Sequence, residues 1–431
     1  MTQALETTAP APHDPAGIAA LYRAHLSRGR GKLGEMFGGQ VEASSSGSVV
    51  RTTDGRAYLN CGGYGVFLAG ACHPKVVAAV EHQLRTHPLS TRLLLEPSAA
   101  HAAAALARVA PPGLERVHFC GSGAEAVETG IKLARSAGHR RLVSMVDGFH
   151  GKTLGALSAT AKPLYQDPFR PLLPDTAHVP YGDIDALAAA LGPDASDACV
   201  ILEPVQGEAG VVIPPDGYLK QVERLCRRTG AFLVLDEVMT GLGRLGTMWG
   251  ADREQVVPDV LLVGKALSGG VVPVAAAIAT PAAFAAFDRD PFLHTSTFSA
   301  APIAMAAARA AVELIEEEDL VGRSHTLGGR LLTMLTRVLG EHCPHLVADI
   351  RGRGLLIGVE FHDAGLVGEF ILELLDQGVV VNHSLNAHTV ARFTPPAVLE
   401  EHELERLEAA VTAAARALAT RLPDPSRPSA Q

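Results

Sequence analysis

The sequence predicts an α/β protein of 431 residues, with a large domain built on a mostly parallel sheet and a smaller α+β domain. Two short runs rich in Val and Leu, at 232–235 and 260–263, are typical of strands buried on both faces of a parallel sheet. From about residue 311 the pattern changes to long amphipathic helices and short strands. The chain is also too long for one small core, which favours two domains.

The expected domain plan has five parts. The first, 1–16, lacks the basic and then apolar pattern of a signal peptide and is expected to be a disordered tail. The small domain is expected to combine 17–69 with 311–422, and the large domain to span 70–310. A second tail is expected at 423–431.

The elements follow in chain order. Within 17–60 we expect a helix and then a hairpin, with strands at 49–51 and 57–60 around the turn signal Thr-Asp-Gly-Arg. Helices are expected at 74–86, at 98–109, after the glycine-rich turn at 121–124, and beginning within 294–302. Further strands are expected at 117–120, 142–146, 199–202, 354–361, 378–381 and 391–393.

Composition excludes several classes of function. The formal net charge of −9 argues against a nucleic acid or an anionic membrane as partner, since such surfaces need clustered Lys and Arg. No apolar run approaches the roughly 20 residues of a membrane helix. The six cysteines and eighteen histidines are scattered without metal-ligand spacing, so we expect no metal site and free thiols in a reducing cytoplasm.

One acid and one amine follow the two buried runs. Asp236 ends the first run, and Lys265 follows the second after Gly264. Both are therefore delivered to the carboxyl edge of the predicted sheet, where open α/β sheets place their ligands. From these runs alone two interpretations stay open: a structural ion pair between the two, or a Schiff-base lysine facing an aspartate at a cofactor ring nitrogen.

The stretch LDEVMTGLGRLG, followed by PDVLLVGKALSGG, resembles the core of the class III aminotransferases, which use pyridoxal 5′-phosphate (PLP) on the fold-type I scaffold. The resemblance continues over residues 58–396. Within the family, DGFHGKTLGALSATAK, EPVQGEAGVVIPPDGYL and DPFLHTSTF are most similar to putrescine and related ω-amine aminotransferases.

The resemblance implies the roles of the residues around the cofactor ring. Lys265 is expected to form the Schiff base and, once free, to move the substrate proton as a base. Asp236 is expected to keep the pyridine nitrogen protonated, because a nearby anion favours the cation. Phe149 and Val238 are expected on opposite faces of the ring. Met239 departs from the glutamine that many relatives use to bond the ring hydroxyl.

The turn Gly-Ser-Gly-Ala opens a helix, and a helix amino terminus is a natural binding place for phosphate. Read alone, such a turn is more often only a tight connection. The resemblance assigns the phosphate contacts to Ser122, Gly123 and Ala124, and a further contact to Thr297 of the neighbouring subunit. It therefore implies a homodimer with the active site at the interface.

The remaining expected site residues surround the cofactor and the substrate. The resemblance places His150 and Glu203 beside the cofactor and Tyr64 against the substrate. Glu208 is expected to gate the site by pairing with Arg392, whose guanidinium would bind the carboxylate of a 2-oxo acid. Read without the family, acids in turns are usually solvated, and an arginine on a strand usually lies at the surface.

The sequence thus predicts ping-pong transfer of an amino group between a primary amine, or the corresponding aldehyde, and a 2-oxo acid and amino acid pair. The alternatives are an ornithine or acetylornithine aminotransferase and a glutamate-semialdehyde-type aminomutase. A nucleotide-binding dehydrogenase would have no use for Lys265, and GSGAE lacks the GxGxxG spacing. The physiological amine and the preferred 2-oxo acid do not follow from the sequence.

Overall fold

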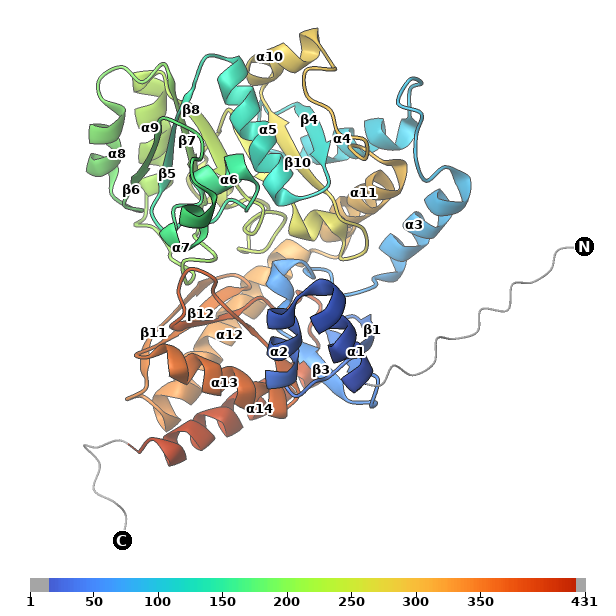
Figure 1. Ribbon diagram of the computed structural model, residues 1–431, viewed down its shortest axis with the longest axis vertical. Helices are drawn as coiled ribbons and strands as arrows, with labels where there is room; N and C mark the ends of the chain where they lie inside the picture. Colours follow the sequence, from blue (N-terminus) through green and yellow to red (C-terminus); the bar gives the residue numbers. More distant parts are fainter. Residues whose placement is uncertain (1–14, 424–431) are drawn as a thin grey trace, which may run out of the picture.

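A computed structural model describes residues 15–423. The predicted tails lie outside these residues, except for positions 15, 16 and 423. The molecule has an upper half that contains one large sheet and a lower half that contains two smaller sheets (Figure 1). The two halves meet at the carboxyl edge of the large sheet, which is where the sequence predicts the site.

The upper half contains a seven-stranded sheet in the order β4-β10-β9-β8-β7-β5-β6. Its strands are β4 (Arg116–Cys120), β5 (Arg141–Met145), β6 (Thr176–Val179), β7 (Ala198–Leu202), β8 (Phe232–Asp236), β9 (Val260–Val263) and β10 (Ala275–Ala279). β10 runs antiparallel to both of its neighbours, and the other neighbouring pairs are parallel. The prediction of a mostly parallel sheet is confirmed. β6 and β10 were not predicted.

Helices cover both faces of this sheet because successive strand residues point to opposite faces. Val234, Leu262 and Ala277 belong to one apolar cluster with α5, whereas Leu233 and Leu261 belong to the main core. The helices of this half are α3 (Pro74–Thr86), α4 (Pro97–Val109), α5 (Gly123–Ser136), α6 (Leu154–Ala159), α7 (Pro163–Gln166), α8 (Ile184–Leu191), α9 (Tyr218–Thr229), α10 (Pro281–Arg289) and α11 (Pro302–Glu317).

The lower half contains two four-stranded sheets, β1-β2-β3-β13 and β11-β12-β15-β14. Their strands are β1 (Glu42–Ser46), β2 (Val49–Thr52), β3 (Ala57–Asn60), β11 (Val347–Arg353), β12 (Leu356–Phe361), β13 (Val379–Val380), β14 (Asn382–His383) and β15 (Val390–Phe393). Three helices pack with them: α12 (Leu320–His342), α13 (Ala364–Asp376) and α14 (Glu401–Arg421). β3 pairs in parallel with β13, so the amino-terminal segment joins the carboxy-terminal one. The exact domain boundaries stay a prediction.

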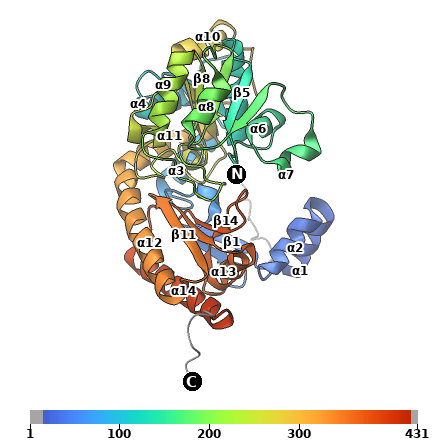
Figure 2. The same ribbon diagram turned by 90° about the vertical axis from the view of Figure 1, so that its left-hand side faces the viewer.

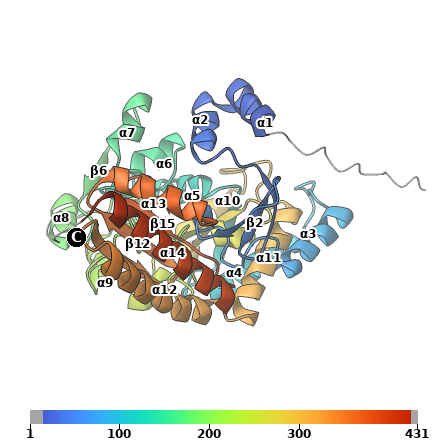
Figure 3. The same ribbon diagram turned by 90° about the horizontal axis from the view of Figure 1, so that it is seen from below.

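The first helices stand away from the rest of the molecule (Figures 2 and 3). The helix expected after position 17 is divided into α1 (Pro15–Leu21), a π-helical turn (Tyr22–Leu26) and α2 (Arg28–Met36). α1 has no buried residue, and α2 buries Gly31. Leu26 and Met36 are each 71% exposed, so residues 15–423 do not cover this apolar surface.

Candidate active site

Lys265 and Asp236 lie at the carboxyl ends of neighbouring strands, as the sequence predicts. β8 and β9 pair in parallel, with Asp236 opposite Leu262, and Lys265 follows β9 after Gly264. Lys265 begins a short 3-10 turn, and its φ of 42° lies in the left-handed region. The strands therefore bring the acid and the amine to the same edge of the sheet.

The amine of Lys265 is free within residues 15–423, where it forms no hydrogen bond or ion pair. Burial lowers the pKa of Lys265, against an opposing effect of the Glu208 charge. A Cβ atom added to Gly65 would lie 3.8 Å from Cδ of Lys265, so this glycine lies beside the lysine stem. Lys265 and Asp236 do not form the structural ion pair that was the alternative interpretation.

Asp236 pairs instead with His150. Its Oδ2 lies 2.7 Å from Nδ1 of His150, and its Oδ1 accepts the backbone N–H of Val238 at 3.1 Å. Burial lowers the pKa of His150, but the hydrogen bond and charge of Asp236 outweigh burial and raise the pKa overall. Both side chains are buried, and Nε2 of His150 has no partner in the described residues. The carboxylate of Asp236 is therefore held in place by two hydrogen bonds.

Glu203 fixes the backbone next to Phe149. Its two carboxylate oxygens accept the N–H groups of Phe149 at 3.0 Å and Gly207 at 3.1 Å. Burial raises the pKa of Glu203 to about 7. Glu203 therefore holds the backbone that carries the Phe149 ring, and its expected role as a wall of the cofactor site stays a prediction.

Val238 lies where β8, β9 and the start of α5 converge. A Cβ atom on Gly123 would lie 2.8 Å from Cγ1 of Val238, and one on Gly264 would lie 3.2 Å from the same atom. Neither glycine could carry a side chain without moving Val238. This close packing brings the helix amino terminus next to the residue expected on one face of the ring.

The turn before α5 has the geometry of an anion site. Ser122 is the residue before the helix, and its Oγ accepts the N–H of Glu125 at 3.3 Å. The first N–H groups of a helix, here those of Gly123 and Ala124, have no acceptor inside the helix. The carboxylate of Glu125 accepts the N–H of Gly121 at 2.7 Å, so part of the turn is already bound.

Met239 is buried against Gly207 and Gly65. A Cβ atom on Gly65 would lie 3.8 Å from Cγ of Met239, and one on Gly207 would overlap its sulfur. A thioether donates no hydrogen bond. The structure therefore provides no donor from this position, in agreement with the departure noted in the sequence.

Glu208 and Arg392 form the second ion pair of the site. Oε2 of Glu208 lies 2.7 Å from Nη1 of Arg392 and also accepts the N–H of Leu385 at 2.9 Å. Nη1 of Arg392 donates to the carbonyl of Gly207 at 3.2 Å. Both side chains are buried, yet Nε and Nη2 of Arg392 have no partner in the described residues. Two donors of the guanidinium are thus available for another acceptor.

Tyr64 and Thr297 are the predicted residues that a single chain does not bring into this group. Tyr64 is 47% exposed and lines a cavity of about 410 Å³ that continues past Asn382 to His383. Thr297 lies in an exposed irregular stretch before α11, and its side chain forms no hydrogen bond within residues 15–423. The expected role of Thr297 in a neighbouring subunit is compatible with this exposure.

Two residues near the site were not predicted. The ammonium of Lys152 lies 4.0 Å from the ring centroid of Tyr165 and 5.9 Å from that of Phe149. Its position directly after Asp-Gly-Phe-His-Gly was the available signal. Arg244 is completely buried and donates to the carbonyl of Gly65. No local pattern indicates its partners, which come from distant segments.

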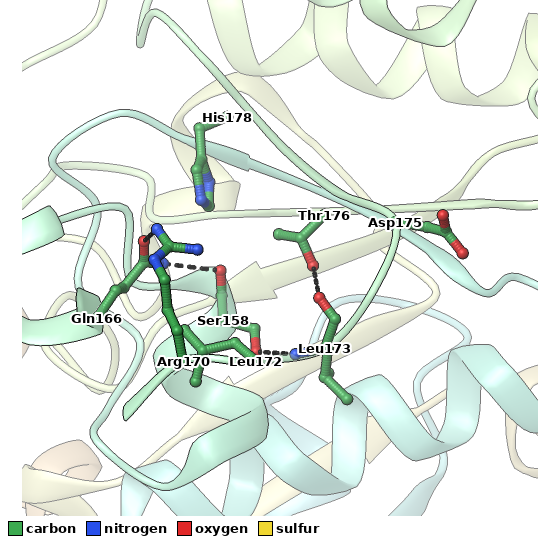
Figure 4. A pocket seen from close by; sticks show the side chains of 8 residues that line it. All are labelled: Ser158, Gln166, Arg170, Leu172, Leu173, Asp175, Thr176 and His178. Carbon is green, nitrogen blue, oxygen red and sulfur yellow. Dashed lines mark hydrogen bonds between the residues drawn. The ribbon is translucent and has the colours of Figure 1, made fainter. Parts of the chain in front are cut away.

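Another pocket lies between α6, α7 and β6, has a volume of about 270 Å³ and is lined by none of the predicted residues (Figure 4). Its polar groups bond one another: Ser158 accepts the N–H of Leu173 at 3.0 Å, and Arg170 donates to Gln166 at 3.1 Å. Among residues 15–423, no group of three or more His, Cys, Asp or Glu side chains could hold a metal ion. None of the described helices could cross a membrane.

Solved structures of several transaminases are similar to this one. The ornithine aminotransferase of Toxoplasma gondii ME49 shares 29% identity with a TM-score of 0.88, over 95% of this chain and 96% of that one. The acetylornithine aminotransferase of Elizabethkingia anophelis shares 27% identity (TM-score 0.80; 93% and 99% covered). A PLP-bound amine transaminase from an uncultivated Pseudomonas species shares 28% identity (TM-score 0.80; 87% and 94% covered).

The family assignment rests on most of the chain. The model of the family described as aminotransferase class-III matches residues 39–414. This range contains Asp236 and Lys265, the turn before α5, and both ion pairs. The protein belongs to the class III aminotransferases and is a PLP-dependent transaminase of fold type I.

Proposed function

We propose that this transaminase takes its amino group from a primary amine, a diamine or an ω-amino compound, and passes it to a 2-oxo acid by ping-pong chemistry. The observation that supports this donor class is the closed pair of Glu208 and Arg392. While Glu208 neutralises Arg392, the site offers no free guanidinium charge to a carboxylate next to the reacting carbon. An amine with an uncharged or cationic chain fits such a site.

The same pair provides a way to accept the second substrate. Arg392 already has Nε and Nη2 without partners, so its planar fork can receive a carboxylate once Glu208 moves away. We infer that Glu208 and Arg392 are paired when the amine is bound and separated when the 2-oxo acid is bound. The site then accommodates two different substrates in the same space.

The residues present fit PLP, which when bound serves as an electron sink for the carbon that loses its proton. We infer that Asp236, positioned by its hydrogen bond to His150, lies at the ring nitrogen. Lys265 is the point of attachment, and its amine, with a pKa lowered by burial, takes the proton at Nζ and returns it. Phe149 and Val238 would bound the ring faces.

The phosphate group would lie at the turn before α5. We infer contacts with Ser122 and with the N–H groups of Gly123 and Ala124, because these groups lie at the start of a 14-residue helix. Glu203 would support the wall next to Phe149. Met239 would contribute packing and no hydrogen bond to the ring.

We also propose a homodimer in which Thr297 reaches the phosphate of the partner's cofactor. Large apolar side chains near Thr297 and in the loop after α3 support this, since such residues rarely stay exposed in a monomer. Their exposed fractions are 88% for Leu93, 77% for Leu94, 103% for Leu95, 81% for Phe292 and 64% for Phe298. Sedimentation equilibrium should give twice the chain mass of 45.0 kDa, and a mass of one chain would contradict the dimer.

Two further parts of the assignment are proposals. The pairing of β3 with β13 supports a small domain made of 17–69 and 311–422 around a large domain of 70–310. All six cysteines are free, which supports a reducing cytoplasmic location.

A second candidate donor is ornithine or acetylornithine, favoured by the similarity to the structures from Toxoplasma gondii and Elizabethkingia anophelis. A glutamate-semialdehyde-type aminomutase is a third, and related aminomutases also carry methionine at the position of Met239. The three differ in substrate and share the cofactor.

The absorbance spectrum of the PLP-loaded protein tests the proposal. Titration with putrescine should bleach the visible band, and ornithine should leave it unchanged. Lys265→Ala should abolish the band of the covalent complex and reduce turnover by at least about 10³-fold, because the attachment point and the base are lost together. Bleaching by ornithine alone would move the assignment to the second candidate, and no band after incubation with PLP would contradict the cofactor site.

A further inference from the structure

Arg244 is a buried arginine that has no acidic ion-pair partner among residues 15–423. Its side chain is completely buried, and no carboxylate of residues 15–423 forms an ion pair with it. A buried charge normally requires a partner of opposite sign or an extensive set of hydrogen bonds. Burial lowers the pKa of Arg244 to about 9, which leaves the guanidinium protonated at neutral pH. Its presence therefore calls for an explanation.

The guanidinium bonds three backbone carbonyls from three separate segments. Nη1 donates to Pro395 at 2.5 Å and to Leu355 at 3.3 Å, and Nη2 donates to Gly65 at 3.2 Å. The carbonyl of Arg244 itself accepts the N–H of Leu355 at 2.8 Å. One side chain of the upper half thus joins the amino-terminal segment to two parts of the lower half.

Two of these three contacts lead to residues of the site. Gly65 follows Tyr64 and lies beside the stem of Lys265. Pro395 follows the end of β15, the strand that carries Arg392. The two segments also bond each other, since the N–H of Thr394 donates to the carbonyl of Cys61 at 2.7 Å. Arg244 therefore connects the loop at Gly65, which lies beside Lys265 and next to Tyr64, to the segment after β15, which carries Arg392.

We propose that Arg244 is a positioning residue for amino transfer, which holds the loop at Gly65 and the end of β15 in a fixed position relative to Lys265. The inference rests on the proposed roles of Lys265 and Arg392. The planar guanidinium offers two separate nitrogens, Nη1 and Nη2, to carbonyls on different segments, whereas a lysine would offer a single nitrogen on a differently shaped stem. A displacement of about 1 Å at a reacting group can reduce the rate by about 10²-fold.

Two variants and one control separate positioning from general stability. Arg244→Lys keeps the charge and removes the fork, and Arg244→Met keeps most of the volume and removes all donors. The control is Arg406→Met, because Nη2 of Arg406 also donates to two carbonyls, of Ala57 at 2.6 Å and Gly378 at 2.9 Å, without contacting the loop at Gly65. All are compared with the native protein by thermal unfolding.

Hydrogen–deuterium exchange without substrate is the first measurement. The amides of Thr394 and Ala397, bonded to the carbonyls of Cys61 and Leu68, report the junction that Arg244 holds. Both Arg244 variants should exchange these amides at least about 10-fold faster, with unchanged exchange in β9. Arg406→Met should leave both regions as in the native protein.

The second measurement is the kinetics of both half-reactions. In the Arg244 variants kcat/KM should fall about 10²-fold for amine and 2-oxo acid alike, with kcat lowered and KM raised, because Lys265 and the two substrate residues are all displaced. A residue with a merely structural role would lower Tm and leave turnover per folded molecule unchanged. If Arg244→Met does not fold, Arg244→Lys decides alone.

Native exchange and native kinetics in Arg244→Lys would overturn the proposal. Failure of the proposed function can be distinguished from failure of this proposal. In that case the native protein itself would show no amine-dependent spectral change. The exchange experiment would still report whether Arg244 holds the junction.

Discussion

The site contains two buried ion pairs of equal length, 2.7 Å each, that differ in how many of their atoms are committed. In the pair of Asp236 and His150, both carboxylate oxygens of Asp236 have donors, from His150 and from Val238. In the pair of Glu208 and Arg392, Nε and Nη2 of the guanidinium have no partner in the described chain. In the first pair both oxygens of the acid are bound and one imidazole nitrogen, Nε2 of His150, has no partner, whereas in the second pair two nitrogens of the guanidinium have none.

The two pairs also differ in the parts of the fold that they join. Asp236 ends β8 and His150 lies in the loop after β5, so two strands of the same seven-stranded sheet set their distance. Glu208 follows β7 of that sheet, whereas Arg392 lies on β15 of the lower half. The first pair lies within one sheet, and the second joins the two halves of the molecule, which is where the proposed exchange of partners would take place. This difference gives each pair a distinct expected response to mutation.

The largest effect is expected for Asp236→Asn. The amide keeps the shape of the carboxylate but removes the charge that the pair supplies, so both half-reactions should slow by about 10³-fold, the upper range for loss of one electrostatic stabiliser. Stopped-flow measurement of each half-reaction checks this. Asp197→Asn is the control, since Asp197 pairs with Arg141 at 3.1 Å before the amino end of β7. Less than a 10-fold loss in Asp236→Asn would contradict a fixed-charge role.

A smaller and unequal effect is expected for Arg392→Lys. A lysine provides a point charge without the two-pronged geometry that suits a carboxylate. The half-reaction with the 2-oxo acid should lose about 10²-fold in kcat/KM, in line with one lost charged hydrogen bond of about 1.5–3 kcal/mol. The amine half-reaction should change less. Equal losses would show that Arg392 acts on both substrates in the same way.

Glu208→Gln should slow the amine half-reaction more than the 2-oxo acid half-reaction, the reverse of Arg392→Lys, and the loss should be smaller. The glutamine cannot neutralise Arg392, so the amine half-reaction should lose about 10-fold in kcat/KM, near the cost of one hydrogen bond to a charged group. The half-reaction with 2-oxoglutarate should be nearly native, because Arg392 is then free for the carboxylate. If both half-reactions change equally, the exchange of partners does not occur.

The smallest expected effect concerns pH and stability. The pKa of His150 is raised in the folded protein, chiefly because the hydrogen bond and charge of Asp236 outweigh burial. A raised pKa contributes stability that is complete below the ordinary histidine value of about 6.5 and is lost as pH rises through the raised value. The native Tm should therefore decline above that range relative to His150→Asn, and Glu208→Gln should keep the native pH dependence. Parallel curves for native protein and His150→Asn would contradict the assignment.

Local patterns predicted much of the fold and the centre of the site. The buried runs of Val and Leu correctly gave β8 and β9, and with them the placement of Asp236 and Lys265 at one edge. β10 was missed because Ala275–Ala279 contains four alanines and one isoleucine, and alanine has little preference for strands. Its place between β4 and β9 depends on partners distant in the chain.

Contacts across long sequence separations were less predictable. Nothing near His150 indicates that its partner lies 86 residues later, or that Arg244 meets carbonyls 151 and 179 residues away. The pair of Glu208 and Arg392 was predicted only through the family resemblance, and its distance is now defined. The catalytic and binding roles of these residues, and of Tyr64 and Thr297, stay predictions.

The left-handed backbone of Lys265 sets a condition for anyone who engineers this protein. At its φ of 42°, a residue with a side chain is less favourable than glycine by about 1–2 kcal/mol. A library selected for heat resistance alone would therefore enrich glycine at this position and discard the reactive amine. Directed evolution of a more durable catalyst must select for turnover in every round, because here the most durable sequence and the working sequence differ.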